Sequence, residues 1–553
     1  MSVDALFTRI KRRDIPTCIN RILSIPEESI DARLYADIWT QELGTGKERL
    51  RPVQGEALEV IHRYKCMLGL IGVGQGKTLI SLMAGTAAGA ERPLLLCPPS
   101  LVDQMQADAD KWGKSFDFIA PKILSYGKLS VASGARLIEE YNPDLIIADE
   151  CHYLRKFDSA RTKRFMRYFL NNPTTGFVGL SGTITNSTLK DYAHLLELAL
   201  RSRAPVPLSR NELDVWSMCM DPKGEATVAD YEKMWPLVNS NFPPNAMKDN
   251  DRKELVRKGY QKRLRSIPGV VCTRQSACDA SLHINAVELP VSLKAQVALT
   301  RLYSTWTRPD GEELSTAAQV AQTARNLSSG FYYKWVWPRG RVNWEWMEAR
   351  AEWNKAVRYR LQYHSKPGFD SPALIQKLVE NGGGGSALRY AWAKWAPLRH
   401  LHAPPKRAMW VDFYVVDYAE KWLKENPKGI VWYQSRAMAD ALRMRGIKVF
   451  GEGSSAPRGG ACAASIRVHG TGKNLQMYNT ALVLEGPANG AAWEQLIGRH
   501  HRPGQGSDLV DFYVLQHTKP VRDALSRARE GALYIEHSIG NVQKLNIARY
   551  LGV

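Results

Sequence analysis

The chain has 553 residues, of which 44% are apolar and 24% are charged, a composition typical of a globular protein. Its length is enough for roughly two or three separate hydrophobic cores. No apolar run reaches the length that spans a membrane, and the first residues lack the apolar block of a secretory signal, so we expect a cytoplasmic protein. The eight cysteines are scattered and include no C-x-x-C pair, which argues against a disulfide framework or a zinc site.

The formal net charge is +20 at pH 7. A basic excess of this size is typical of proteins that bind polyanions, because neutralising phosphates releases condensed counterions. The alternative is that the charge only keeps the surface solvated. Charge alone does not decide between the two. Combined with the motifs below, it favours a long DNA or RNA track over a small acidic substrate.

The most informative segment is a glycine loop between an apolar run at residues 67–71 and a helix-like run at residues 79–84. Strand, glycine loop and helix in this order form a phosphate cradle, because the backbone N–H groups of closely spaced glycines and the positive end of the helix converge on phosphate oxygens. We expect this cradle to use Gly74 and Gly76.

Two side chains directly after the glycines would complete the phosphate site. Lys77 would neutralise the β- and γ-phosphates, and the Thr78 hydroxyl would reach a bound Mg²⁺. Ile71 stands where the strict G-x-x-x-x-G-K-[ST] pattern has its first glycine. A purely structural glycine turn is therefore the alternative interpretation of this loop.

A pair of carboxylates follows a second apolar segment. Residues 143–148 are predicted to form a buried strand of a parallel sheet, which places Asp149 and Glu150 at its carboxyl end, where ligands bind in open α/β sheets. Asp149 can hold the Mg²⁺, and Glu150 can orient the attacking water, because phosphoryl transfer needs positioning and charge neutralisation more than covalent chemistry. An Asp-Glu pair alone is most often a solvated loop, but its position after an apolar strand favours a metal and water site.

These segments resemble the DExH-box motors of helicase superfamily 2 and, within it, the Swi/Snf-like DNA translocases. The resemblance covers most of residues 50–515. It implies an α/β fold with two RecA-like parallel-sheet lobes and a large, mainly helical insertion between them, with ATP and Mg²⁺ in the cleft and DNA across both lobes. Such motors commonly keep only the later G-x-G-K-T part of the glycine loop, which fits the departure at Ile71.

The resemblance also implies roles for residues of the first lobe. Gln54, at the end of the Leu-Arg-Pro-Val-Gln segment, is similar to the family's adenine contact. The residues implied to grip the nucleic-acid backbone are Pro99, Ser100, Gln104, Ser125 and Tyr126. The Leu-Ser-Gly-Thr segment at residues 180–183 matches the motif that couples hydrolysis to strand movement, which assigns this coupling to Ser181 and Thr183.

Two segments of the second lobe resemble further motifs that contact the DNA track. Residues 429–435 form a predicted strand that ends in a Gln-Ser pair, like the family's fourth motif, and residues 465–475 keep the register of the fifth. The DNA contacts that this similarity implies are Gln434, Ser435, Thr471 and Asn474.

The sixth motif is the sharpest match. Residues 495–505 follow the family pattern Q-x-x-G-R-x-x-R-x-G-Q, which implies that Gln495 belongs to the nucleotide site and that Arg499 and Arg502 enter it from the opposite lobe. Arginine suits this role because its planar fork donates two hydrogen bonds to phosphate oxygens and stays charged. The alternative for the two arginines is a surface ion-pair cluster.

The positions of the motifs divide the chain into four predicted parts. They are an N-terminal accessory segment at residues 1–49, a first lobe at 50–190, a mainly helical insertion at 191–406 and a second lobe at 407–553. Within the insertion, residues 263–274 and the following segment resemble the return of the chain from a helical protrusion to the first lobe.

An aromatic segment lies within the predicted insertion. Residues 330–338 and the tryptophans Trp344, Trp346 and Trp353 are interleaved with arginines. Aromatic rings near arginines can stack on nucleic-acid bases, but large rings spaced along helices more often fill a core. We therefore favour core packing and keep base stacking as the alternative.

The predicted activity is ATP-driven translocation on duplex or branched DNA, in replication or recombination. Only residues 476–494 separate the fifth and sixth motifs, which leaves little room for a strand-separating hairpin. The compact layout resembles motors encoded by bacteriophages and prophages, which implies a bacterial or phage-infected cytoplasm. The alternatives are an RNA-directed DExH helicase and a catalytically weak DNA-binding scaffold that uses ATP only as a conformational ligand.

Overall fold

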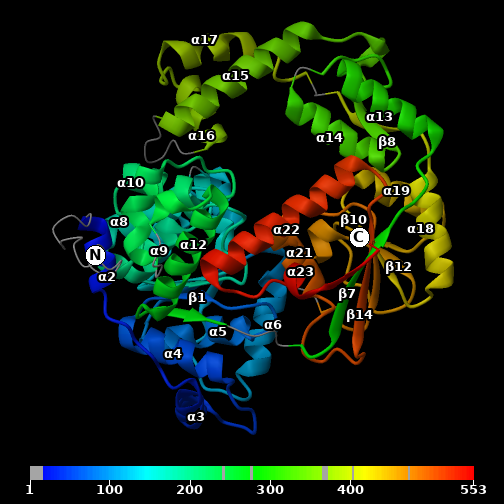
Figure 1. Cartoon of the computed structure of the whole chain (residues 1–553). Coiled ribbons are helices and arrows are strands. Elements are labelled where there is room, and N and C mark those ends of the chain that lie inside the picture. Colours follow the sequence, from blue (N-terminus) through cyan, green and yellow to red (C-terminus); the bar gives the residue numbers. More distant parts are fainter. Residues whose placement is uncertain are drawn as a thin grey trace. The chain divides into compact units, whose positions relative to one another are not determined.

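The computed structural model describes residues 17–157, 159–238, 243–273, 278–314, 316–363, 371–401, 404–470 and 474–552. These residues form a mixed α/β structure with a six-strand sheet, a seven-strand sheet and a two-strand ribbon, so the predicted α/β class is confirmed. The chain divides into two compact units, the first comprising Met1–Ser276 with Gly531–Gln543 and the second Ala277–Glu530 with Lys544–Val553 (Figure 1). Among the described residues, no helix combines the length and the apolar character needed to cross a membrane.

The first unit is built on the six-strand sheet, whose strand order is β3-β2-β4-β5-β1-β6. Its strands are β1 (Met67–Leu70), β2 (Pro93–Cys97), β3 (Lys122–Ser125), β4 (Leu145–Asp149), β5 (Gly176–Leu180) and β6 (Val270–Cys272). All neighbouring pairs are parallel. Every residue of β1, β2, β4 and β5 is buried, which explains their uninterrupted apolar sequences. Because the strands are parallel, their carboxyl ends meet at one edge.

Helices cover both faces of this sheet. In Figure 1, α4 and α5 lie on one side of β1, and α9 and α12 lie on the other. The first face shares a continuous hydrophobic core with α3 and α6. The helices that the first unit contributes up to residue 200 are α2 (Thr17–Ser24), α3 (Ala32–Leu43), α4 (Pro52–Tyr64), α5 (Lys77–Ala88), α6 (Val102–Trp112), α7 (Leu137–Tyr141), α8 (Ala160–Asn171) and α9 (Ala193–Leu200). Residues 1–16 of the predicted accessory segment lie outside the described residues.

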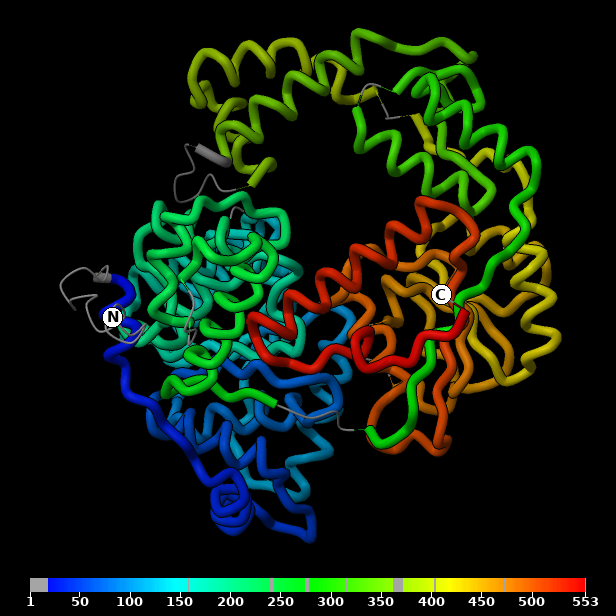
Figure 2. Tube along the Cα trace, in the orientation of Figure 1, coloured from blue at the N-terminus to red at the C-terminus, as the bar shows by residue number. Residues whose placement is uncertain are grey.

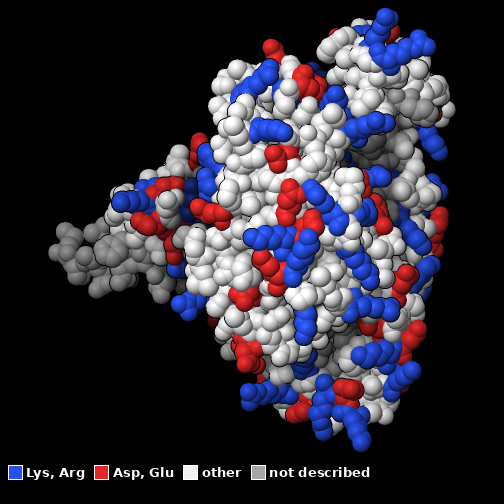
Figure 3. Space-filling view, turned by 90° about the vertical axis from the view of Figure 1, so that its right-hand side faces the viewer, with Lys and Arg blue, Asp and Glu red and all other residues white. Residues whose placement is uncertain are grey.

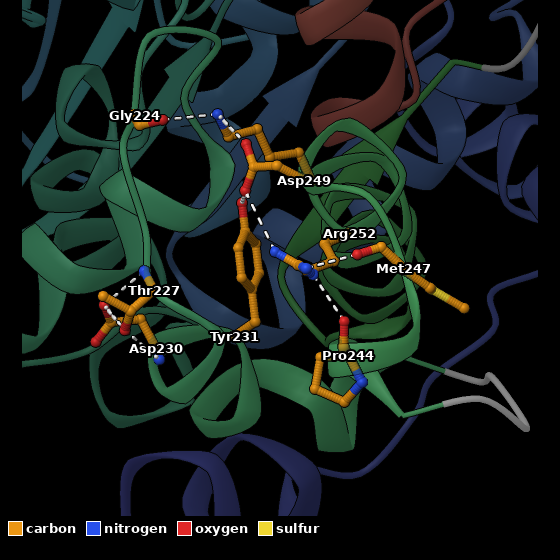
Figure 4. A network of polar contacts seen from close by, with 9 residues as sticks. Gly224, Thr227, Asp230, Tyr231, Pro244, Met247, Asp249 and Arg252 are labelled. Atoms are coloured by element: carbon orange, nitrogen blue, oxygen red, sulfur yellow. Dashed lines mark hydrogen bonds and ion pairs between the residues drawn. The ribbon is translucent and has the colours of Figure 1, made fainter.

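A helical appendage, α10 (Arg210–Met220), α11 (Val228–Met234) and α12 (Asp249–Ser266), precedes β6. Polar contacts fix the start of α12 (Figure 4). Asp249 accepts a hydrogen bond from the Tyr231 hydroxyl at 2.8 Å and pairs with the Lys253 ammonium at 2.9 Å. Arg252 donates to the carbonyl oxygens of Pro244 and Met247 at 2.7 and 2.5 Å. The oriented α12 leads into β6, which pairs with β1 and completes the sheet.

The second unit is built on the seven-strand sheet, whose order is β11-β12-β10-β13-β14-β7-β15. Its strands are β7 (Ser281–Val287), β10 (Ile430–Tyr433), β11 (Val449–Phe450), β12 (Cys462–Ser465), β13 (Thr480–Val483), β14 (Leu509–Leu515) and β15 (Arg549–Leu551). All neighbouring pairs are parallel. Figure 2 shows the green segment with β7 beside the orange segment with β14, although more than 200 residues separate them in the sequence. A strand that we assigned to the insertion thus belongs to the second sheet.

The helices of this unit contribute to two hydrophobic cores, of which one includes the sheet. One hydrophobic core joins α18 and α19 to β10, β12 and β13, and a second joins α13 and α14 to the ribbon strand β8. The elements are α13 (Leu293–Thr305), α14 (Ala317–Ser328), β8 (Phe331–Trp335), β9 (Lys406–Trp410), α18 (Tyr414–Glu425), α19 (Arg436–Met444), α20 (Ile466–His469), α21 (Gly490–Ile497), α22 (Lys519–Ile539) and α23 (Lys544–Ile547). From Gly531 on, α22 belongs to the first unit.

Three further helices, α15 (Trp344–Tyr363), α16 (Pro372–Glu380) and α17 (Ser386–Trp395), form a small module with a core of its own. Within the aromatic segment, Phe331, Trp346 and Trp353 are buried, which confirms core packing for these rings. Trp344 is 66% exposed and does not belong to this core.

Candidate active site

The glycine loop between β1 and α5 has the backbone geometry of a tight cradle. Gly74 and Gly76 adopt φ angles of 85° and 84°, a left-handed region that favours glycine. Gly76 is the residue from which α5 starts, so the first N–H groups of the helix follow the loop directly. A Cβ atom on Gly76 would lie 2.4 Å from the Gln54 side-chain nitrogen. The backbone conformation therefore favours glycine here, and a larger residue would also displace the Gln54 amide.

The Gly76→Ala substitution is expected to lower the unfolding free energy by about 1–2 kcal/mol and to weaken the predicted ATP binding, because alanine is strained in the left-handed conformation and its Cβ atom displaces Gln54. Thermal unfolding and ATP affinity would measure the two effects. Gly506→Ala is the matched control, since a Cβ atom there meets nothing within 4 Å and φ is not in the left-handed region. Equal behaviour of the two variants would contradict the proposed constraint.

The start of α4 is tied to the glycine loop. Gln54 accepts a hydrogen bond from the Arg51 N–H at 2.8 Å and donates one to the Gly76 carbonyl at 3.1 Å. The Arg51 guanidinium donates to the Gly74 carbonyl at 2.9 Å. The residue predicted to contact adenine is only 5% exposed and lies against the loop that was predicted to bind phosphate.

The lysine after the loop folds back over it. The Lys77 ammonium donates to the carbonyl oxygens of Ile71 and Gly72 at 3.0 and 3.1 Å. Thr78, the next residue, is half-buried in the first turn of α5. The positive charge therefore lies on the loop, within reach of the N-terminal end of the helix, where an anion is favoured.

The carboxylate pair lies at the end of β4, as the sequence predicts. Asp149 and Glu150 are 5% and 8% exposed. Burial raises the pKa of Asp149, the charge of Glu150 raises it further, and the charge of Lys77 acts in the opposite direction. Glu150 has a left-handed backbone with φ of 54°, which is strained for a residue with a side chain. The two buried carboxylates and the lysine thus share one electrostatic environment that favours a bound cation.

A hydrogen-bond network connects the second carboxylate to the end of β5. The His152 Nδ1 atom lies 3.1 Å from Glu150 Oε2 and 3.1 Å from Ser181 Oγ. Ser181 Oγ is 3.4 Å from Glu150 Oε2 and accepts a hydrogen bond from the Thr183 N–H at 3.1 Å. Of the residues predicted to couple hydrolysis to movement, Ser181 therefore contacts the predicted water-positioning residue, and Thr183 contacts Ser181. The sequence interpretation assigned no role to His152.

The same segment also packs against the glycine loop. The Ser181 N–H donates to the Gly69 carbonyl at 3.0 Å, and a Cβ atom on Gly182 would lie 3.0 Å from the Ile71 carbonyl. A displacement of residues 180–183 would therefore shift both the glycine loop and the Glu150 carboxylate.

Four of the predicted nucleic-acid contacts of the first lobe follow β2 and β3 at the same sheet edge. Pro99 and Ser100 are exposed in a short 3₁₀ turn after β2. Gln104 is exposed on α6, where its side-chain nitrogen donates to Asp108 at 3.0 Å. Ser125 ends β3 and is only 8% exposed. The exposed contacts thus lie in the segment after β2.

Tyr126, the fifth of these residues, is fully buried. Its hydroxyl donates to the Asp149 carbonyl at 2.9 Å, and its ring stacks on Tyr153 with 5.2 Å between centroids. The side chain therefore supports the backbone of the carboxylate pair and does not face a surface on which nucleic acid could lie. Burial explains the difference, since the sequence alone does not indicate which way this ring points.

In the second unit, the Gln-Ser pair after β10 is held by a carboxylate that the sequence interpretation missed. The N–H groups of Gln434 and Ser435 donate to Glu485 Oε2 at 2.6 and 2.7 Å. The Gln434 side-chain nitrogen donates to the Glu485 carbonyl at 2.6 Å. Glu485 follows the buried strand β13, the same signal that identified Asp149. Its carboxylate occupies two donors that a phosphate would need.

The residues of the sixth motif follow α21 in the second unit. Arg499 is 6% exposed, and its Nε atom donates to the Gln495 carbonyl at 3.1 Å. The Arg502 guanidinium donates to the side-chain oxygen of Asn474. These contacts group residues of the predicted fifth and sixth motifs. Thr471 lies outside the described residues.

The histidine after Arg499 is a buried, neutral side chain. His500 Nε2 accepts a hydrogen bond from Trp432 Nε1 at 3.1 Å, so Nδ1 carries the proton that it donates to the Tyr478 carbonyl at 2.9 Å. Burial lowers the pKa of His500 from 6.5 to about 4. His500 thus connects Trp432 of β10 to the Tyr478 carbonyl as a neutral side chain whose protonation is disfavoured.

This shift predicts acid sensitivity. Because the unfolded chain takes up the proton at His500 first, the unfolding free energy is expected to fall by about 3 kcal/mol as pH drops from about 6.5 to about 4. His500→Gln should lose most of this dependence, since an amide can make both hydrogen bonds without titrating. Denaturant unfolding at pH 7.5 and pH 4.5 would measure it, with the exposed His400→Gln as control. An unchanged pH dependence in His500→Gln would refute the assignment.

No protein-family model matches the chain, and no curated protein matches it either. Among the described residues, no group of three or more His, Cys, Asp or Glu side chains is placed to hold a metal ion. The functional argument therefore depends on the geometry of the residues above.

Proposed function

We propose that the protein is an ATP-dependent DNA translocase of the Swi/Snf-like superfamily 2 type, which hydrolyses ATP to move on or remodel duplex or branched DNA. One observation carries the proposal. The glycine loop with Lys77 and the buried pair Asp149 and Glu150 meet at the carboxyl edge of one parallel sheet, where α/β proteins bind ligands. Replication or recombination in a bacterial or phage-infected cytoplasm is the setting that the sequence resemblance implies.

The residues present fit ATP with Mg²⁺. Magnesium is usually held by one or two protein groups together with substrate phosphates, so Thr78 and Asp149 suffice without a larger acidic cluster. When bound, Mg²⁺ would neutralise the phosphate charge. Lys77 would bind the phosphates, and Glu150, oriented by His152 and Ser181, would hold the attacking water.

The second parallel sheet supports the proposed pair of RecA-like lobes. Its arginines Arg499 and Arg502 follow a helix that connects two adjacent parallel strands, β13 and β14. In the proposed mechanism these arginines enter the nucleotide site and stabilise the transferred phosphoryl group, so closure of the lobes controls hydrolysis.

An ATPase assay with single-stranded, duplex and branched DNA and with RNA tests the proposal. Duplex or branched DNA is expected to stimulate turnover at least as well as single strands, and RNA to stimulate less. Stimulation by RNA alone would favour an RNA helicase, and ATP binding without turnover would favour a scaffold. Efficient unwinding of a forked duplex, with no stimulation by duplex DNA, would overturn the translocase assignment.

The net charge of +20 predicts the salt dependence of binding. If phosphates form the track, log affinity for nonspecific duplex DNA should fall linearly with log salt, by about 0.9 per phosphate contacted. On the face drawn in Figure 3, Lys and Arg are interspersed with Asp and Glu, so the slope should report a limited number of contacts and not the whole charge. Fluorescence anisotropy over a salt series would measure it, and a flat dependence would contradict a phosphate track.

A further inference from the structure

A cavity of about 470 Å³ lies in the second unit, beside the carboxyl ends of β10 and β13. This volume is in the range of small-ligand sites. The polar groups among its lining residues include those of Gln322, Arg325, Asn326, Tyr333, Gln434 and Glu485. The first three come from α14, and Pro520, Val521 and Ala524 of α22 add an apolar wall. The cavity is thus a polar pocket with one apolar side.

One wall of the cavity is acidic. The hydrogen bonds of Glu485 come from neutral donors, the N–H groups of Gln434 and Ser435 and the hydroxyls of Ser329 and Ser435. A partly buried carboxylate that accepts from neutral groups favours a further hydrogen-bond donor and repels an anion. The position next to the Gln-Ser pair therefore does not suit a phosphate.

Another wall is basic. Arg325 lines the cavity, and its guanidinium donates to the Gln322 side-chain oxygen at 2.8 Å. Burial lowers the pKa of Arg325, and the nearby charge of Arg527 lowers it further. A guanidinium that lines a cavity favours an anion there. The cavity thus has both an acceptor, Glu485, and a cation, Arg325, among its lining groups.

We propose that this cavity binds a single nucleotide unit, with an amino group of the base on Glu485 and the phosphate on Arg325. The amides of Gln322 and Asn326 can donate to and accept from the remaining base atoms. This site is separate from the glycine loop, which belongs to the first unit. The nucleotide can be a free monophosphate or an unpaired nucleotide of a strand, since both present the same chemistry.

The decisive experiment compares cytosine with uracil, which differ by an amino group in place of a carbonyl oxygen. Calorimetry with CMP and UMP would use the Lys77→Ala protein, so that the glycine loop does not dominate the signal. Anisotropy with labelled oligo(dC) and oligo(dU) would test whether the cavity binds an unpaired nucleotide of a strand. Cytosine is expected to bind about tenfold more tightly than uracil, as a hydrogen bond to a charged group implies.

Two variants test which lining residue causes the preference for cytosine over uracil. Glu485→Gln should abolish it, since the amide still accepts the two N–H groups but is no longer an acceptor-only carboxylate. Arg325→Ala should weaken cytosine and uracil ligands alike and keep their ratio. Lys421→Gln, an exposed charge on α18 that does not line the cavity, is the matched control. Thermal unfolding would verify that each variant is folded.

The outcomes separate the sources of the ligand. A cytosine preference for monophosphates supports a free nucleotide, and a preference only among oligonucleotides supports an unpaired nucleotide of a strand. Equal binding of cytosine and uracil ligands by the unchanged cavity would overturn the proposal, as would a preference that survives in Glu485→Gln. Neither result depends on ATP turnover, so failure here is distinguishable from failure of the proposed ATPase.

Discussion

The Glu150→Gln protein is expected to bind ATP with near-normal affinity and to lose about 10²- to 10⁴-fold in turnover. Glutamine has the size of glutamate but cannot take a proton from water or polarise it as a carboxylate does. The residue is only 8% exposed, and His152 and Ser181 contact its Oε2 atom, so its carboxylate is held in one position. DNA-stimulated kcat and separately measured ATP affinity would test both parts.

Glu91→Gln is the matched control for this substitution. It makes the same chemical change in the same unit, but the Glu91 side chain is 84% exposed. Full turnover is expected in this control. Normal turnover in Glu150→Gln would remove Glu150 from the mechanism. Loss of ATP affinity together with turnover would indicate that the residue holds the loop in place and does not position water.

The first half of the site could be predicted because its signals are local. The glycine loop joins a strand to a helix within a few residues, and Asp149 and Glu150 come directly after an apolar strand. In a parallel sheet the carboxyl ends of such strands share an edge, so local patterns are enough to bring Lys77 near Asp149. The structure agrees, since the charge of Lys77 acts on the Asp149 carboxyl.

The other features of the fold and of the candidate site depend on contacts between segments that are distant in the sequence. Local sequence patterns do not encode such contacts. Strand β7 pairs with β14, which lies more than 200 residues later in the chain, and the sequence of β7 does not indicate which strand it pairs with. Glu485 meets the Gln-Ser pair 50 residues earlier, and Tyr126 turns inward onto Asp149. These positions are decided by burial and by the need to satisfy polar groups, which appear only when the whole unit is packed.

Arg502→Ala is expected to lower DNA-stimulated turnover by about 10³- to 10⁵-fold, the range of arginine fingers in phosphoryl transfer. The residue belongs to the second unit, whereas the loop and both carboxylates belong to the first, so the substitution leaves the proposed ATP-binding elements of the first unit unchanged. Arg502→Lys should recover little activity, because an ammonium keeps the charge but lacks the planar fork. Arg443→Ala, which removes an exposed arginine of α19, should retain full turnover.

If Arg502→Ala has a normal kcat, hydrolysis does not need the second unit, and the proposed closure of two lobes around ATP is wrong. A loss confined to the DNA-stimulated rate, with the basal rate unchanged, would instead assign Arg502 to the track, where its contact with Asn474 already places it beside a predicted DNA-binding residue.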